Sequence, residues 1–314
     1  MKKQKLRNKH YKSLLEGFST WLTTLGYSAS TVYNLPNFVQ GFLYYQEERA
    51  RQLSDWEGGH FRSYMEYSSE RKNERRAGGL SNSHINKIAH SLELFQRYLL
   101  QTNQGEQYTS LKRLANNSKP LEIFSQAQIK ELYNACPNTL IGIRQKAMLG
   151  LCYGCGLRSS EACNLELKDI WWDRELLQVR HSKTKQSRLV PIASPVLDNL
   201  YFYAQEVRPL LQEHSNLSYY LLTLRGGKMS HQTLYKSFHR LLECTDYPLT
   251  GLHSLRHSIA SHLAASGMPS EQIAQLLGHK TLDSTQIYLS LIHISEPTRP
   301  RLISYAVFCL KKKK

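Results

Sequence analysis

Apolar residues recur at three- and four-residue steps through the first hundred positions of the chain. The first set with this spacing comprises Tyr11, Leu14, Leu15, Phe18, Trp21, Leu22 and Leu25. This period places apolar side chains on one face of a helix. Gly26 ends this predicted helix, and Ser28 or Ser30 caps the next. Two more helices are predicted after Ser54 and after Ser81.

The composition changes after this helical region. Residues 106–120 are rich in Gln, Asn, Thr, Ser and Lys, which is typical of a linker. The periodic pattern restarts over 121–288, where two β-prone runs, 176–180 and 188–192, flank a polar turn. We therefore expect a mainly α-helical protein with one small β-sheet. It would have a helical domain over 8–105 and an α+β domain after the linker.

Helix starts can be placed from capping residues in the second half. Ser125 with Gln128 forms a plausible capping box, in which the two side chains satisfy each other's backbone N–H groups. Farther along, Ser159 or Ser160 is predicted to cap a short helix that bears Glu161.

The net charge of +16 predicts a polyanionic partner, most simply nucleic acid. A basic protein kept soluble by its charge is the alternative. No apolar run approaches the roughly 20 residues of a membrane span, and the basic start leads into no apolar signal sequence. We therefore expect a cytoplasmic protein whose six cysteines are reduced. Cys152 and Cys155 lie in an apolar run, which favours structural thiols over a metal site.

Six polar residues form the candidate chemistry. In chain order they are Arg158, Lys183, His253, Arg256, His279 and Tyr288. Fixed cations and hydrogen-bond donors can stabilise the charge that develops on a phosphodiester under attack, without a metal. A tyrosine hydroxyl, with a pKa near 10, becomes a nucleophile where such a pocket favours its anion. Taken singly, each of these residues would more often be a surface, capping or packing residue.

Three motifs around these residues have a familiar form. They are Gly-Leu-Arg-Ser-Ser-Glu at 156–161, Leu-His-Ser-Leu-Arg-His at 252–257 and Leu-Leu-Gly-His at 276–279. The chain thereby resembles the tyrosine recombinase (phage integrase, Xer-type) family. The resemblance implies an N-terminal helical core-binding (SAM-like) domain over 8–105 and a catalytic domain over 121–288.

The resemblance also implies an activity. The expected enzyme is a site-specific DNA recombinase that cuts and rejoins DNA through a 3′-phosphotyrosyl intermediate, with no metal and no cofactor. A type IB topoisomerase-like enzyme and a catalytically inactive DNA-binding relative are the alternatives. The expected partner is double-stranded DNA, bound by a homotetramer on two paired sites.

The family motifs assign roles to the candidates. Arg158 and Arg256 would clamp the scissile phosphate, and Tyr288 would attack it. Glu161 resembles the family's supporting acid, although a purely structural role is equally compatible with its position.

The remaining catalytic roles go to one lysine and two histidines. Lys183 would be the general acid, because its distance from the Arg-x-Val-Pro strand selects it over Lys185. His253 would hydrogen-bond the phosphate or shuttle a proton, and His279 would donate a hydrogen bond to the phosphate or orient the nucleophile.

A basic loop of the first domain is the candidate DNA contact outside the catalytic centre. Its cations are Arg71, Lys72, Arg75 and Arg76. The loop could follow a phosphate backbone, or it could simply be solvated.

The last 26 residues, 289–314, resemble translated sequencing-adapter read-through. Leu289–Arg299 and Ile303–Lys314 correspond in one reading frame to a transposase-type library adapter, and the three residues between them fall at its variable index. A segment of this origin carries no information about the fold of the protein. It carries six basic residues and one acid, so the rest of the chain has a net charge of +11.

Sequencing the gene directly from genomic DNA is expected to give a different continuation after the Tyr288 codon. An adapter is joined to a DNA fragment during library preparation and is absent from the genome. Genomic DNA that encodes Leu289–Lys314 unchanged would contradict the adapter interpretation.

Overall fold

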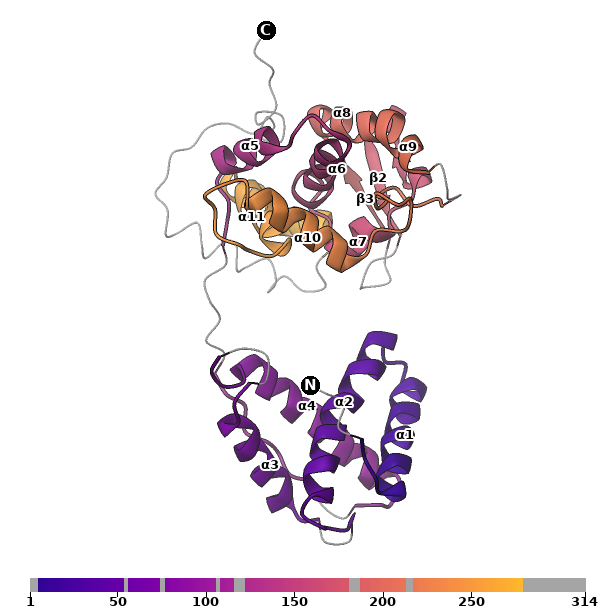
Figure 1. Cartoon of the computed structure of the whole chain (residues 1–314), viewed down its shortest axis with the longest axis vertical. Coiled ribbons are helices and arrows are strands. Elements are labelled where there is room, and N and C mark those ends of the chain that lie inside the picture. The colour runs from indigo at the N-terminus through magenta and orange to yellow at the C-terminus, as the bar shows by residue number, and fades with distance from the viewer. Residues whose placement is uncertain are drawn as a thin grey trace. The chain divides into compact units, whose positions relative to one another are not determined.

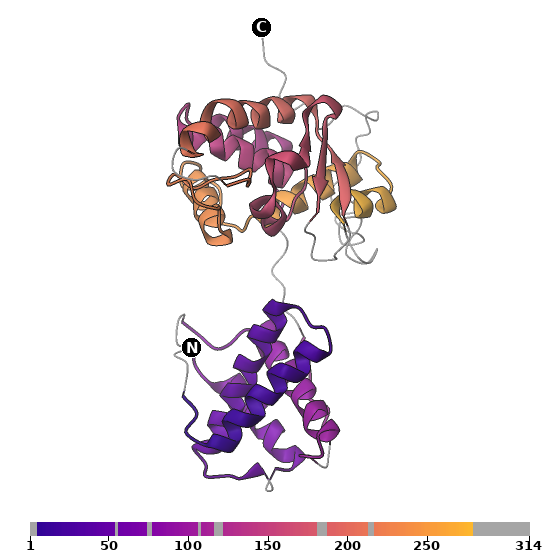
Figure 2. The same ribbon diagram turned by 90° about the vertical axis from the view of Figure 1, so that its right-hand side faces the viewer.

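The computed structural model describes most of the chain. The described ranges are 5–53, 56–73, 77–105, 108–115, 122–180, 187–212 and 217–278. The chain divides into two compact units, Met1–Lys119 and Pro120–Lys314, and Figures 1 and 2 show both. No helix in the described ranges is long and apolar enough to cross a membrane.

Several predicted features lie outside the described residues. They are the loop residues Arg75 and Arg76, the catalytic candidates Lys183, His279 and Tyr288, and the tail 289–314. The expectations for them stay predictions.

The first unit contains four described helices. They are α1 (Lys9–Thr24), α2 (Ala29–Glu47), α3 (Gly58–Glu70) and α4 (Asn82–Gln101). The amide of Thr31 donates to the Ser28 hydroxyl, so Ser28 rather than Ser30 caps α2. Ser81 caps α4 in the same way. Helix α4 packs against the other three helices.

Aromatic side chains dominate the core of this unit. Phe42 stacks on Phe61 with ring centroids 4.7 Å apart, and Trp56 and Tyr64 meet it edge-on at 5.1 and 5.5 Å. Phe42 is fully buried. Each buried ring of this kind stabilises the fold by roughly 1.5–3 kcal/mol. Most of the apolar face predicted for α1 is buried in the same core, whereas its last member, Leu25, is 54% exposed.

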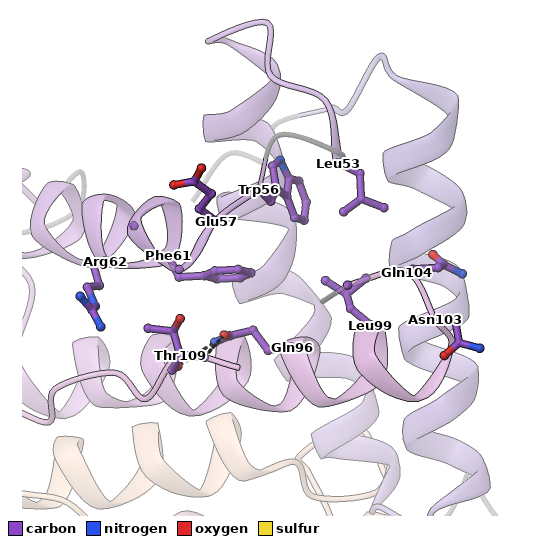
Figure 3. A pocket seen from close by; sticks show the side chains of 13 residues that line it. Leu53, Trp56, Glu57, Phe61, Arg62, Gln96, Leu99, Asn103, Gln104 and Thr109 are labelled. Carbon is purple, nitrogen blue, oxygen red and sulfur yellow. Dashed lines mark hydrogen bonds between the residues drawn. The ribbon is translucent and has the colours of Figure 1, made fainter. Parts of the chain in front are cut away.

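The segment after α4 is bound to α4 by two side-chain amides. Gln96 accepts from the Thr109 amide at 2.7 Å and donates to the Thr109 carbonyl at 3.1 Å (Figure 3). Asn86 makes the same pair of bonds with Leu114, both at 2.8 Å. Leu111 is buried in the core. Residues of the expected linker thus pack against the first unit.

A cavity of about 820 Å³ lies beside this segment. Figure 3 shows the apolar side chains of Trp56, Phe61 and Leu99 and the charged side chains of Glu57 and Arg62 around it. None of the site residues within the described ranges lines this cavity.

The second unit is built around one buried helix. Its described elements are α5 (Gln126–Ala135), α6 (Leu140–Leu149), η2 (Gly150–Gly154), α7 (Ser159–Asn164), η3 (Leu167–Asp169), β1 (Ile170–Trp171), η4 (Trp172–Arg174), β2 (Leu176–Val179), β3 (Arg188–Pro191), α8 (Ser194–Phe202), η5 (Tyr203–Val207), α9 (Arg208–Gln212), α10 (His231–Leu242), α11 (His253–Ala265) and α12 (Ser270–Leu277). Helix α6 continues into the π-helical η2, and this central helix contacts α8 and η5 as well as α10 and α11 (Figure 1).

The sheet has three antiparallel strands in the order β1-β2-β3. Leu177 pairs with Ile170 of β1 and with Val190 of β3. The expectation of a mainly helical protein with a small sheet is confirmed. Strand β1 was not predicted, because two residues are too few to show the alternation that marks a strand. Strand β3 also contacts α12, which joins the sheet to the candidate site.

One predicted helix cap is confirmed and another is wrong. The Gln128 amide donates to the Ser125 hydroxyl at 3.2 Å, and the Ser125 amide donates to the Gln128 side chain at 2.8 Å, which completes the capping box. At α7, however, the N-cap is Arg158 and not Ser159 or Ser160.

Arg158 is the N-cap of α7 because of a side chain farther along the same helix. The Glu161 carboxylate accepts from the Arg158 amide at 2.9 Å. The Arg158 amide is one of the N–H groups at the start of α7 that have no acceptor within the helix, and this bond gives it one. Arg158 is therefore the N-cap, and the helix begins at the next residue.

A fragment of residues 1–115 is expected to be more stable than a fragment of residues 1–105. The shorter fragment lacks Leu111, and its Gln96 side chain loses both hydrogen bonds to Thr109. Together these losses cost roughly 2–5 kcal/mol. Urea unfolding followed by far-UV circular dichroism measures the difference. Leu111→Ala in the longer fragment should give an intermediate stability, and equal midpoints for the two fragments would contradict the packing described.

Candidate active site

The candidate site is organised around the carboxylate of Glu161, in the first turn of α7. Its side chain has no exposed surface. Arg158 binds it with both backbone and side chain, because its amide donates to Oε2 at 2.9 Å and its Nη1 donates to Oε1 at 2.8 Å. Two residues of the first motif, three positions apart, are therefore fixed to each other.

A second arginine, Arg188 at the start of β3, binds the same carboxylate with two parallel bonds. Its Nη1 donates to Oε1 of Glu161 at 3.1 Å and its Nη2 donates to Oε2 at 2.9 Å. Its Nε donates to the carbonyl of Leu276 at 2.8 Å. Sequence reasoning missed this contact and used Arg188 only to mark a strand. The available signal was a basic residue that begins a strand directly after a predicted active-site turn.

Arg256 approaches the cluster from α11. Its Nη1 lies 3.7 Å from Oε2 of Glu161 and donates to the carbonyl of Gly156 at 2.7 Å. Its Nη2 donates to the carbonyl of Leu277 at 2.5 Å. The side chain is 4% exposed. Two of the three family motifs therefore meet at one carboxylate.

The third motif meets the others through the C-terminal end of α12. Arg158 Nη2 donates to the carbonyl of Gly278 at 2.9 Å, and Arg256 binds the carbonyl of Leu277. The last carbonyls of a helix lack partners within it and carry partial negative charge, which cations stabilise. Gly278 has a φ of +67°, a conformation that glycine adopts readily. His279 is the next residue in the sequence.

The charges of the described side chains in this cluster do not sum to zero. Three guanidinium groups surround one carboxylate, which leaves a net charge of +2. Burial would by itself raise the pKa of Glu161, but hydrogen bonds and charge from Arg188, together with bonds from Arg158, lower it below its ordinary value. The carboxylate is therefore ionised at neutral pH, and the excess positive charge suits an anionic ligand.

Arg158 is the arginine of the cluster that is most open to solvent. Its side chain is 19% exposed, against 9% for Arg188. Among the described residues its Nε and one of its Nη2 hydrogens have no acceptor. These donors are available to an anion.

His253 is the first residue of α11, one helical turn before Arg256. Burial of part of its ring, and then the charges of Arg256 and Arg158, lower its pKa. Its ring centroid lies 6.4 Å from that of His257. A neutral imidazole carries one N–H, so His253 can donate one hydrogen bond at neutral pH and accept another.

The two cysteines of the C-x-x-C sequence are buried in the core of the second unit. Burial raises the pKa of the Cys155 thiol to about 12. Within the described residues, no group of three or more His, Cys, Asp or Glu side chains is placed to hold a metal ion.

The described part of the basic loop begins where α3 ends. Arg71 is the C-cap residue of α3, and Lys72 forms a backbone bridge with Gly79. Arg71 is half-buried, whereas Lys72 is exposed.

Comparisons with known proteins identify the family of this chain. Residues 122–293 match the model of the phage integrase family. The chain belongs to this family. Tyrosine recombinase XerA of Thermococcus kodakarensis is 31% identical over 88% of this chain and 89% of its own length. Tyrosine recombinase XerC of Oceanobacillus iheyensis is 32% identical over 67% of this chain and 70% of its own length.

A solved structure shares the fold. It is the Tn1549 transposon integrase in complex with transposon right end DNA, which has a TM-score of 0.69 and 16% identity and covers 88% of this chain and 94% of its own. The expected enzyme class, a tyrosine-type site-specific recombinase, is confirmed by these matches. They favour the recombinase over the topoisomerase-like enzyme and over the inactive relative.

Acid is expected to destabilise this recombinase partly through His257. Burial, with charge from His253 and Arg256, lowers its pKa from 6.5 to about 4 in the folded protein. As the pH falls below 6.5, the unfolded chain takes up the proton first, so the free energy of unfolding decreases until about pH 4. His257→Gln should lessen this decrease, measured as the thermal midpoint across the window. The exposed His10→Gln should keep the wild-type slope, and equal slopes for all three proteins would contradict the effect.

Proposed function

We propose that Arg158 and Arg256 of this recombinase clamp the scissile phosphate of double-stranded DNA while Tyr288 attacks it. The observation that carries the proposal is the meeting of both arginines at the Glu161 carboxylate and the end of α12. Among the described residues the cluster has excess positive charge, and Arg158 has donors without an acceptor. Gly278, which follows α12 and accepts from Arg158, precedes His279 in the sequence. Fixed donors of this kind stabilise the charge of a phosphoryl transition state.

The proposed reaction balances without a metal or cofactor. The Tyr288 hydroxyl gives its proton to the free nitrogen of neutral His253 as its oxygen bonds to phosphorus, and the bond from phosphorus to the 5′ oxygen breaks. Lys183 gives a proton to that oxygen, while His253 and His279 donate hydrogen bonds to the non-bridging oxygens. The 3′-phosphotyrosyl link stores the bond energy. A 5′ hydroxyl of the partner strand then attacks phosphorus and gives its proton to Lys183, while His253 returns a proton to the departing Tyr288 oxygen, which rejoins the DNA.

DNA is the proposed partner of both units. The related Tn1549 integrase is described in complex with transposon right end DNA, and this chain has a net charge of +11 without its last 26 residues. In the first unit, the core-binding domain, the proposed phosphate contacts are Arg71, Lys72, Arg75 and Arg76. Strand exchange needs two cleaved sites, so we propose a homotetramer on two paired sites.

Tyr288→Phe is expected to abolish covalent protein–DNA adducts and to leave DNA binding close to that of the wild type, because one hydroxyl is lost. Adducts are measured by denaturing gel on a pool of nicked duplexes, in which the nick lets the cleaved fragment diffuse away. Tyr201→Phe, at an exposed tyrosine of α8, serves as the control and should keep full adduct formation. Adducts that persist in Tyr288→Phe would assign the nucleophile to another residue.

A further inference from the structure

Arg188 has three separate contacts in the cluster and little access to solvent. Its guanidinium binds both oxygens of Glu161, its Nε binds the carbonyl of Leu276, and its side chain fills the space beside Gly278. A Cβ at Gly278 would lie 2.8 Å from Nη1 of Arg188 and 3.2 Å from its Cδ. One side chain of the sheet therefore fixes both α7 and the end of α12.

We infer that Arg188 is a positioning residue for DNA cleavage, which holds Glu161 and the last turn of α12 so that Arg158 stays directed at the phosphate. This inference rests on the proposed function of Arg158 as a phosphate clamp. The contacts of Arg188 are to the Glu161 carboxylate and the Leu276 carbonyl, and it acts on cleavage through these two groups.

Removal of Arg188 would leave the Glu161 carboxylate with fewer hydrogen-bond donors. Glu161 Oε1 now accepts from both Arg158 and Arg188, and Oε2 accepts from the Arg158 amide and Arg188. Without Arg188, the remaining cations beside the carboxylate among the described residues would be Arg158 and Arg256, and it would draw their donors away from a phosphate. A lysine cannot replace the two parallel bonds and the Leu276 bond, because an ammonium group is a single point charge.

The test compares Arg188→Lys with the wild type on nicked DNA whose scissile group is either a phosphodiester or a methylphosphonate. The methylphosphonate carries no negative charge, so its cleavage depends less on the direction of the arginine donors. Arg188→Lys should slow adduct formation about 10- to 100-fold on saturating phosphodiester DNA, because small misplacements of reacting groups have effects of this size. On methylphosphonate the loss relative to the wild type should be much smaller. DNA affinity should stay close to wild type, whereas the thermal midpoint should fall, because the buried carboxylate loses two hydrogen bonds.

Two glycine variants give an independent measurement on the phosphodiester substrate. Gly278→Ala places a Cβ against Arg188, whereas Gly267→Ala meets no atom within 4 Å, and both positions have a positive φ of +67° and +88°. Alanine is thus placed at a positive φ in both variants, and the φ of Gly267 is the less favourable of the two for alanine. Gly278→Ala should slow adduct formation at least about tenfold more than Gly267→Ala. Arg158→Ala is the positive control for loss of the clamp.

The results separate this inference from the proposed function. A rate for Arg188→Lys within about twofold of wild type, an equal loss on both substrates, or equal rates for the two glycine variants would each overturn the positioning role. If Arg188→Lys does not fold, the glycine pair decides. Wild-type adducts that do not depend on Tyr288 or Arg158 would instead overturn the proposed function.

Discussion

The sharing of one buried carboxylate among three guanidinium groups is the interaction on which the site depends. A lone carboxylate in the interior would be strongly unfavourable, and so would three neighbouring guanidinium groups without an anion. Glu161 makes the arrangement stable because each of its oxygens accepts from two donors. The cluster keeps a net charge of +2. Glu161 is buried and holds the three arginines together, and it thereby makes an anion site possible.

The C-terminal end of α12 is the second component of this arrangement. Its last carbonyls need partners outside the helix, and they receive them from arginines of three other elements. Arg188 binds Leu276, Arg256 binds Leu277, and Arg158 binds Gly278. Arginines that would otherwise repel one another are thus held together by dipoles as well as by charge. The same bonds join α7, β3 and α11 to the helix that precedes His279.

The sequence alone determined the family, the enzyme class and the helical architecture. Periodic apolar faces, the Ser125–Gln128 capping box and the three motifs are local features, and local features can be read without a structure. The motifs also identified Arg158 and Arg256, and the structure places both at one carboxylate. The assignments of Lys183, His279 and Tyr288 still rest on the sequence.

Only the tertiary structure showed which contacts connect these local features. Arg188 and Glu161 are 27 positions apart, and no periodicity or motif spacing links a strand residue to a helix residue at such a separation. The N-cap of α7 is Arg158 and not one of the predicted serines, because the buried Glu161 carboxylate accepts a hydrogen bond from the Arg158 amide. Thr109 likewise joined the first unit through Gln96, although its surroundings have the composition of a linker. In each case a buried polar group needed a partner, and only the folded chain shows which partner lies within reach.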